Sequence, residues 1–205
     1  MSYIKSNLSI TLNITLVIIL LMTISACSNQ VTSNQPAVTK QTAESSIEEL
    51  QIYKNAIVAL NNNELAKAEK LFISMSERQP NIAGSWANLA LISIKQDNLA
   101  QAEVYAKTAL EKNPNMPQAL NLSGYLAQKK GAINIAKSYY LQAISHKSDY
   151  ALAHYNLALV YDVYLQDIAK AIEHYQFYLA YSKTKDENTE NWLEGLKATM
   201  AANNS

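Results

Sequence analysis

A period of 34 residues constrains this chain more than any other feature of its sequence. Pro80 and Pro114 are one period apart. Small residues recur at the same interval in two series. One is Ala68, Ala102, Ala136 and Ala171, whose last member comes one residue late, and the other is Ala90, Gly124 and Ala158. A fourth series is Phe72, Ala106, Tyr140 and Tyr175. Independent series on one period indicate tandem copies of one unit, and such units bury their apolar faces only by stacking.

Each copy predicts a pair of helices joined by a tight turn. Glycine and proline number only four each, and the chain is rich in good helix formers. Polar turn signals lie within the copies at 61–63, 96–98 and 130–131, where asparagine, aspartate and glycine gather. Pro80 and Pro114 follow the second helices, which proline cannot continue. We therefore expect an all-α protein built from helical hairpins.

The spacing of small and bulky residues resembles the tetratricopeptide repeat. The resemblance implies a right-handed α-solenoid of about four hairpins within residues 45–182, with repeats at about 49–82, 83–116, 117–150 and 151–184. Counting position 1 from 49, 83, 117 and 151, small residues stand at position 8 of all four repeats, at position 20 of repeats one to three, and at position 27 of repeats two and three. The chain departs from the family pattern at Ser93 and Ala106, which replace aromatics, and at Ser148, which replaces the proline. A one-residue insertion near 164–167 shifts the second helix of repeat four.

Both ends of the repeat region carry their own signals. Ser46-Ile47-Glu48-Glu49 fits a capping box, which predicts that the first helix starts there. Near the other end, apolar residues recur at helical spacing: Trp192, Leu193, Leu196 and Met200. We expect residues 186–202 to form a capping helix that covers the last repeat.

The N-terminal residues predict a targeting signal rather than a folded segment. Lys5 is followed by an apolar stretch, densest at 16–22, and Ile24-Ser25-Ala26-Cys27 ends it. This order is typical of a secretory signal peptide, here residues 1–26. The last four residues resemble the bacterial lipobox, which implies that Cys27 is acylated and becomes the first mature residue. The alternative is an uncleaved anchor, although polar residues interrupt the stretch and its dense part is shorter than the ~20 residues of a span.

Residues 27–44 are expected to be the lipidated cysteine and a flexible linker, because large apolar side chains are nearly absent. Residue 28 is Ser rather than Asp. In bacteria with two membranes, that resemblance implies an anchor in the outer membrane with the body in the periplasm. An inner-membrane or cell-membrane lipoprotein is the alternative.

The resemblance also implies where a partner would bind. In this family the first helices line a concave face through positions 2, 5, 9, 12 and 13. The predicted groove residues are Tyr53, Leu91, Lys95, Asn121, Tyr125, Gln128, Lys129, Tyr155 and Asp162. Exposed aromatics beside amides suit an extended peptide or an amphipathic helix. The carboxylate clamp of some members is not expected, because Asn88 alone matches it; Asn88 and Asn156 are expected to be structural.

The sequence offers no catalytic or cofactor motif. The chain has 17 acidic and 17 basic residues, so it lacks the basic excess that nucleic-acid binding requires. Its four glycines form no phosphate loop. His146, His154 and His174 lack the further ligands that a zinc site needs, and are expected to be packing or surface histidines.

We therefore expect neither an enzyme nor a cofactor, a metal or a small-molecule substrate. The predicted function is a membrane-anchored scaffold that binds protein partners of the cell envelope. The alternatives are a pilotin-like assembly factor for type IV pili or secretins, as the resemblance implies, and a structural lipoprotein that self-associates through its end repeats. The resemblance also extends to repeat proteins that accompany TonB-type systems.

Overall fold

The computed structural model of this protein describes the backbone of residues 37–203 and the side chains of residues 45–203. Every regular element in this range is helical, as expected for an all-α protein. The elements are α2 (Ala37–Asn61), α3 (Leu65–Arg78), α4 (Ala83–Lys95), α5 (Leu99–Lys112), α6 (Pro117–Lys129), α7 (Ile133–His146), α8 (Ala151–Leu159), η1 (Val160–Tyr164), α9 (Ile168–Tyr181) and α10 (Glu187–Asn203).

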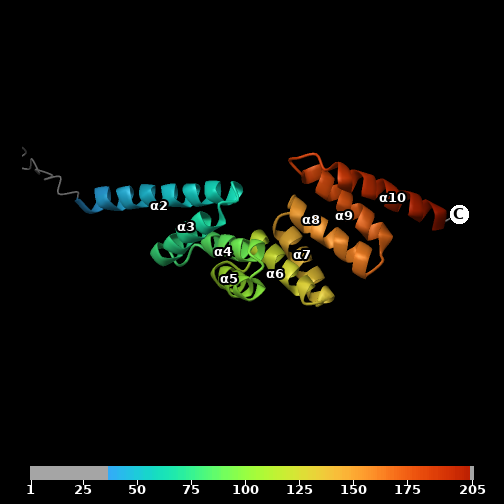
Figure 1. Cartoon of the computed structure of the whole chain (residues 1–205), viewed down its shortest axis with the longest axis horizontal. Helices are drawn as coiled ribbons and strands as arrows, with labels where there is room; N and C mark the ends of the chain where they lie inside the picture. Colours follow the sequence, from blue (N-terminus) through green and yellow to red (C-terminus); the bar gives the residue numbers. More distant parts are fainter. Residues whose placement is uncertain (1–36, 204–205) are drawn as a thin grey trace, which may run out of the picture. The chain divides into compact units, whose positions relative to one another are not determined.

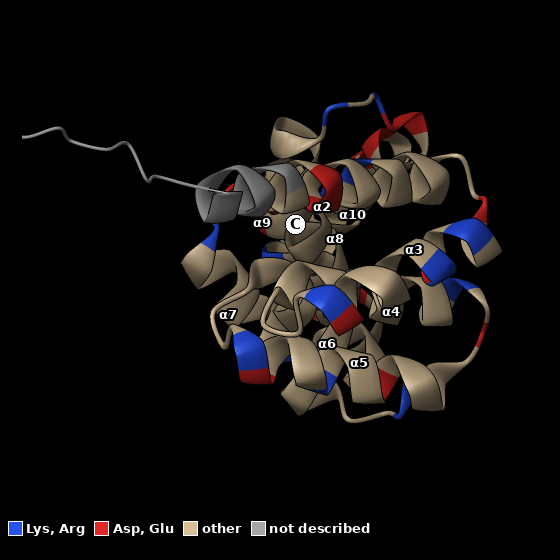
Figure 2. Cartoon of the chain, turned by 90° about the vertical axis from the view of Figure 1, so that its left-hand side faces the viewer, with Lys and Arg blue, Asp and Glu red and all other residues tan. Residues whose placement is uncertain are grey.

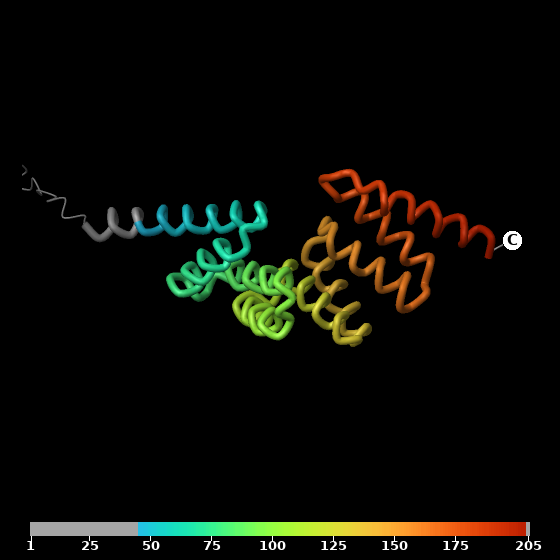
Figure 3. The backbone as a smooth tube through the Cα atoms, viewed as in Figure 1, coloured from blue at the N-terminus to red at the C-terminus, as the bar shows by residue number. Residues whose placement is uncertain are grey.

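The helices pair in sequence order and the pairs stack along the chain (Figure 1). Four hairpins follow one another: α2 with α3, α4 with α5, α6 with α7, and α8 and η1 with α9. Each second helix also packs on the first helix of the next hairpin, and the backbone trace shows this alternation (Figure 3). Residues 46–205 form one compact unit. The predicted helical solenoid is confirmed.

One residue in each hairpin turn adopts a left-handed backbone conformation. These residues are Asn63, Asp97, Gly131 and Gln166, with φ between 53° and 75°. Asn, Asp and Gly accept this conformation at low cost, whereas Gln does so rarely. The first three lie in the predicted turns and repeat at 34 residues, and Gln166 comes one residue late.

Small residues bring the paired helices close together. Ala56 and Ala68 of the first hairpin are fully buried, as are Ala90 and Ala102 of the second. Bulkier side chains then fill the remaining space, with Phe72 at position 24 of the first hairpin also fully buried. Apolar burial of about 25 cal/mol per Å² is the main contribution to the stability of such a stack.

The first helix starts earlier than the capping box predicts. α2 begins at Ala37, so Ser46 lies inside a helix of 25 residues and does not cap it. The expected linker at 27–44 is therefore helical in its second half, while residues 27–36, including Cys27, lie outside the described residues. The physical reason is composition: residues 37–45 contain Ala, Lys, Gln and Glu without Gly or Pro, so helix can propagate.

In repeat four the inserted residue is absorbed inside a helix. α8 continues into the π-helix η1, where the N–H of Leu165 donates to the carbonyl of Val160 at 3.0 Å. This bond spans five residues instead of four, so one extra residue fits without a loop. The extra residue is thus accommodated at 160–164, which meets the predicted 164–167 segment at residue 164. Leu157 of α8 and Val160 of η1 are both buried in the core of repeat four.

The last helix packs as expected, but with fewer apolar residues than expected. α10 lies on α9, and within it Leu193 is buried and Leu196 is partly buried against the core of repeat four. Trp192 is 55% exposed and contacts repeat four through its indole N–H, which donates to the Oδ2 of Asp162, while Met200 is 37% exposed. The helix starts behind Asp186, whose carboxylate accepts hydrogen bonds from the backbone and side chain of Thr189.

The two ends of the stack differ. At the C-terminal end α10 covers α9. At the other end one face of α2 is open among the described residues, and it presents Gln51, Lys54 and Val58, all exposed. These residues stand at positions 3, 6 and 10. The same positions of α6 are the buried residues Ala119, Leu122 and Leu126.

Candidate functional site

Amide side chains tie the first helices of neighbouring hairpins together along the predicted groove. The Nδ2 of Asn88 donates to the carbonyl of Gly84 at 2.9 Å and to the hydroxyl of Tyr53 at 3.3 Å. The Nε2 of Gln118 donates to the Oδ1 of Asn88 at 3.1 Å. Burial raises the pKa of Tyr53, and the Asn88 bond opposes this. Asn88 is thus structural, as expected, and Tyr53 belongs to the same network.

The same arrangement joins hairpins three and four. The Nδ2 of Asn156 donates to the Oδ1 of Asn121 at 2.9 Å, and Asn121 is only 6% exposed. Asn121 stands at position 5 and Asn156 at position 6 of the next repeat, as do Tyr53 and Asn88. The prediction that Asn121 faces a ligand is therefore wrong. Its side chain is used between helices, where an unpaired buried amide would be costly.

Two further predicted groove residues serve as acceptors for buried tyrosines. The hydroxyl of Tyr140 donates to the Oε1 of Gln128 at 2.9 Å. The hydroxyl of Tyr175 donates to the Oδ2 of Asp162 at 3.3 Å, and the indole N–H of Trp192 donates to the same oxygen at 2.7 Å. Gln128 and Asp162 both stand at position 12. Their polar character is explained by the tyrosines at position 24 of the same hairpins.

The remaining predicted groove residues have no comparable internal bonds. Leu91, Tyr125 and Tyr155 are half-buried, and Lys95 and Lys129 are exposed. The Nζ of Lys129 lies 5.6 Å from the centre of the Tyr125 ring, which is within range of a cation–π contact. Within residues 45–203, neither Lys95 nor Lys129 has a carboxylate within 4.0 Å. These residues lie on the first helices α4, α6 and α8. They are called the central trough, after the concave face that the resemblance predicts: Leu91, Lys95, Tyr125, Lys129 and Tyr155.

The contact between the first helices of hairpins two and three is apolar. Ala87 and Leu122 occupy positions 5 and 6 of hairpins two and three, where the neighbouring steps have hydrogen-bonded pairs. Leu91 packs partly against the same cluster. At the far end of the trough, Tyr155 lies edge-on to Tyr175 and 4.9 Å from the ring of Tyr178. The central trough therefore combines apolar and aromatic surface with two lysines that have no carboxylate partner within the described residues.

The charge distribution and one hollow describe the rest of the surface. Basic and acidic residues are interspersed over the helices (Figure 2). A hollow of about 620 Å³ between α5, α6 and α7 contains none of the nine predicted residues, and an ion pair between Glu103 and Lys130 lies at its edge. In the part of the chain that the structure describes, no cluster of three His, Cys, Asp or Glu side chains could hold a metal, and no helix is long and apolar enough to span a bilayer.

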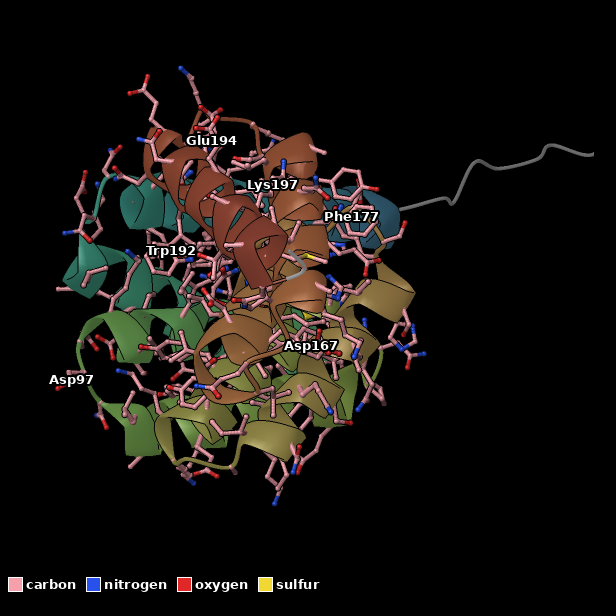
Figure 4. The ribbon with its side chains drawn as sticks, turned by 90° about the vertical axis from the view of Figure 1, so that its right-hand side faces the viewer. Asp97, Asp167, Phe177, Trp192, Glu194 and Lys197 are labelled. Carbon is pink, nitrogen blue, oxygen red and sulfur yellow. The ribbon has the colours of Figure 1, made fainter. Side chains whose placement is uncertain are left out.

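The sequence analysis missed one close pair of titratable groups. The Nδ1 atoms of His154 and His174 are 3.0 Å apart, within an aromatic cluster that includes Phe177 and Tyr181. Phe177 on α9 and Trp192 on α10 lie on opposite sides of the last two helices (Figure 4). The two histidines were expected on the paired helices of repeat four, but a spacing of 20 residues does not by itself predict a contact between them.

Comparison with known proteins supports the fold. No family model and no curated protein matches this chain. Solved structures do match it. PilF from Pseudomonas aeruginosa is 17% identical, with a TM-score of 0.65, over 75% of this chain and 69% of that one. The tetratricopeptide-repeat protein TTC0263 from Thermus thermophilus is 18% identical, with a TM-score of 0.59, over 72% and 80% of the two chains.

A third match is a repeat domain seen with a ligand. The first tetratricopeptide repeat domain of Spaghetti (RPAP3), bound to the HSP90 peptide SRMEEVD, is 17% identical, with a TM-score of 0.53. The alignment covers 58% of this chain and 96% of that one. At sequence identities this low, the comparison supports a shared fold and nothing further. Together with the repeating hairpins, it shows that residues 46–203 have the fold of tetratricopeptide-repeat proteins.

Proposed function

We propose that this protein is a membrane-anchored scaffold of the bacterial envelope, which binds a segment of a partner protein in the central trough and is not an enzyme. One observation carries the proposal. On one row of first helices, lysines without a carboxylate partner lie beside half-buried aromatic and apolar side chains. Such a surface suits an extended or helical peptide. The peptide bound by RPAP3 supports this use of the fold.

The charges in the trough indicate the chemistry of the partner segment. Among the described residues Lys95 and Lys129 have no carboxylate partner, whereas the carboxylate of Asp162 already accepts two hydrogen bonds. A segment that carries Asp or Glu beside apolar side chains would satisfy both lysines. A carboxylate clamp of the kind that uses asparagine is not available, because the amide of Asn88 is committed to Gly84, Tyr53 and Gln118.

The test of the trough is a charge reversal. Lys95→Glu/Lys129→Glu should abolish capture of the partner from detergent-solubilised membranes, while the circular dichroism spectrum stays unchanged. The matched control is Lys107→Glu/Lys112→Glu on α5, which makes the same charge change at exposed positions outside the trough. If both double variants capture the same proteins as the original chain, the trough is not the binding site.

The anchor needs a separate test, because Cys27 lies outside the described residues. We propose that Cys27 carries the acyl chains and that Ser28 directs the protein to the outer membrane. Cys27→Ser should abolish labelling by radioactive palmitate and release the protein from membranes. Ser28→Asp should keep the label and move the protein to the inner-membrane fraction. Labelling of the Cys27→Ser variant would refute the assignment.

A pilotin-like role in pilus or secretin assembly is the second candidate, and the structural likeness to PilF favours it. It would give the same trough a pilus or secretin subunit as partner, so the captured proteins distinguish the two roles. The structure argues against self-association through the first repeat. The open face of α2 presents Gln51 and Lys54, and stacking would remove the charge of Lys54 from water at a cost in free energy.

A further inference from the structure

Two histidines of hairpin four face each other through like atoms. The Nδ1 of His154 on α8 lies 3.0 Å from the Nδ1 of His174 on α9, and the Nε2 of His154 lies 3.0 Å from the carbonyl oxygen of Ser148. A carbonyl only accepts, so the Nε2 of His154 must carry a hydrogen. In the neutral ring its Nδ1 is then an acceptor. The hydrogen between the two rings therefore belongs to the Nδ1 of His174.

The surroundings of the two histidines make a second positive charge unfavourable. His154 is 3% exposed, and the rings of Phe177 and Tyr181 lie 5.0 and 5.7 Å from its ring centre. Tyr161 stacks on His174 with an interplanar angle of 3°. The charged and titratable groups around the pair are Glu173 and Tyr181 on α9, Tyr161 on η1, Lys170 over the Tyr161 ring, and Lys147 and Asp149, which pair beside Ser148.

We propose that the His154–His174 pair is a proton-sensitive contact that loosens hairpin four in mildly acidic solution. A first proton can enter at the Nε2 of His174 and leave the bond between the rings intact. A second proton must enter at the Nδ1 of His154, where it replaces the acceptor lone pair and places two cations 3.0 Å apart. The contact between α8 and α9 then breaks.

The direction of the pH effect follows from linkage. Burial, followed by the neighbouring His154, lowers the pKa of His174 below its ordinary 6.5, while Glu173 opposes the change. In the unfolded chain His174 takes up its proton near pH 6.5. Below that pH the unfolded state binds this proton more readily than the folded state, so the contribution of His174 to stability is complete above 6.5 and is lost as the pH falls.

The effect should be local to the C-terminal end of the stack. The two histidines join the helices that also position Tyr155 and Tyr175, and α10 packs on α9. Hairpins one to three contain only His146, which is exposed at the end of α7. Acid would thus release the Tyr155 end of the central trough first. This inference goes beyond the proposed function and holds whatever partner the trough binds.

The experiment compares single-histidine variants over pH. Between pH 7.5 and 5.5 the Tm of the original chain should fall about 3 °C further than that of His174→Gln, which lacks one titrating ring and can still donate to His154. His146→Gln is the matched control and should follow the original chain. Hydrogen exchange at pH 5.5 should rise in α9 and α10 before it rises in α4 and α5.

A measurement on the unaltered protein guards against a variant that fails to fold. Long-range ¹⁵N spectra at pH 7.5 should show His154 protonated at Nε2 alone and His174 protonated at Nδ1 alone. The proposal is overturned if both rings become doubly protonated at pH 5.5 while exchange in α9 stays slow. It is equally overturned if His174→Gln retains the full loss of Tm.

Discussion

Hairpins three and four solve the same packing problem in different ways. Both place a buried tyrosine at the aromatic position of the second helix, Tyr140 in one and Tyr175 in the other. In hairpin three the first helix makes room with Gly124, where an added Cβ would lie 2.6 Å from the Tyr140 ring. In hairpin four the corresponding residue is Ala158, and an extra residue in the π-helix η1 changes the register instead.

The comparison also explains why polar residues line part of the concave face. Both tyrosine hydroxyls need an acceptor, and position 12 supplies one as Gln128 or Asp162. In hairpins one and two, position 24 is Phe72 or Ala106, and position 12 is Leu60 or Ile94. The polarity of position 12 thus follows the aromatic residue inside the same hairpin, and need not report on a ligand.

The largest expected effect tests whether Tyr140 and Tyr175 contribute equally to the free energy of unfolding. Tyr140→Ala and Tyr175→Ala should each lower the free energy of unfolding by about 4 kcal/mol, because each leaves a cavity in a fully packed hairpin. Chemical denaturation followed by circular dichroism measures this. A loss below about 1 kcal/mol for either variant would show that its hairpin collapses around the gap, and the two solutions would not be equivalent.

The next prediction tests the close approach of Gly124 to the Tyr140 ring. Gly124→Ala should lower the free energy of unfolding by about 2 kcal/mol, since the new methyl group overlaps the buried Tyr140 ring. Gly195→Ala on α10 is the control, because nothing lies within 4 Å of its added Cβ, and it should be neutral or slightly stabilising. In a Tyr140→Ala background the same Gly124→Ala change should cease to destabilise the protein.

Alkaline pH tests the burial of the two tyrosines. Burial raises the pKa of both Tyr140 and Tyr175 well above the ordinary value of 10, and in Tyr175 the Asp162 carboxylate adds to the effect. Above pH 10 the unfolded chain loses protons that the folded chain keeps, so stability should fall by about 1 kcal/mol per pH unit for each tyrosine. Ultraviolet titration of the phenolate absorbance should show Tyr140 and Tyr175 among the late-titrating tyrosines, and the late fraction should shrink in Tyr140→Phe and Tyr175→Phe. An unchanged late fraction in both variants would contradict this.

The smallest effect concerns the hydroxyls alone. Tyr140→Phe and Tyr175→Phe should each cost about 1 kcal/mol, the net contribution of one hydrogen bond. The cost for Tyr175 should shrink in Asp162→Leu, because the acceptor has then gone as well. Thermal melts of the two single variants and the double variant measure this coupling. Additive losses would mean that Asp162 is polar for another reason.

The repeat period was sufficient to predict the fold, and it was insufficient to assign the site. Hairpin boundaries, left-handed turns and close contacts all depend on residues within one 34-residue unit, so they can be predicted locally. The roles of Asn121, Gln128 and Asp162 depend on which side chain from another helix reaches them. The start of α2 at Ala37 was missed because a polar helix has no apolar face to reveal it.

The polar face at Gln51 and Lys54 differs from the faces that join the hairpins inside the stack. Another hairpin packed in front of this face would meet longer and more polar side chains than hairpin three presents to hairpin two within the stack. Lengthening the stack by design would therefore require Gln51, Lys54 and Val58 to be replaced by the alanine and leucines that α6 has at these positions.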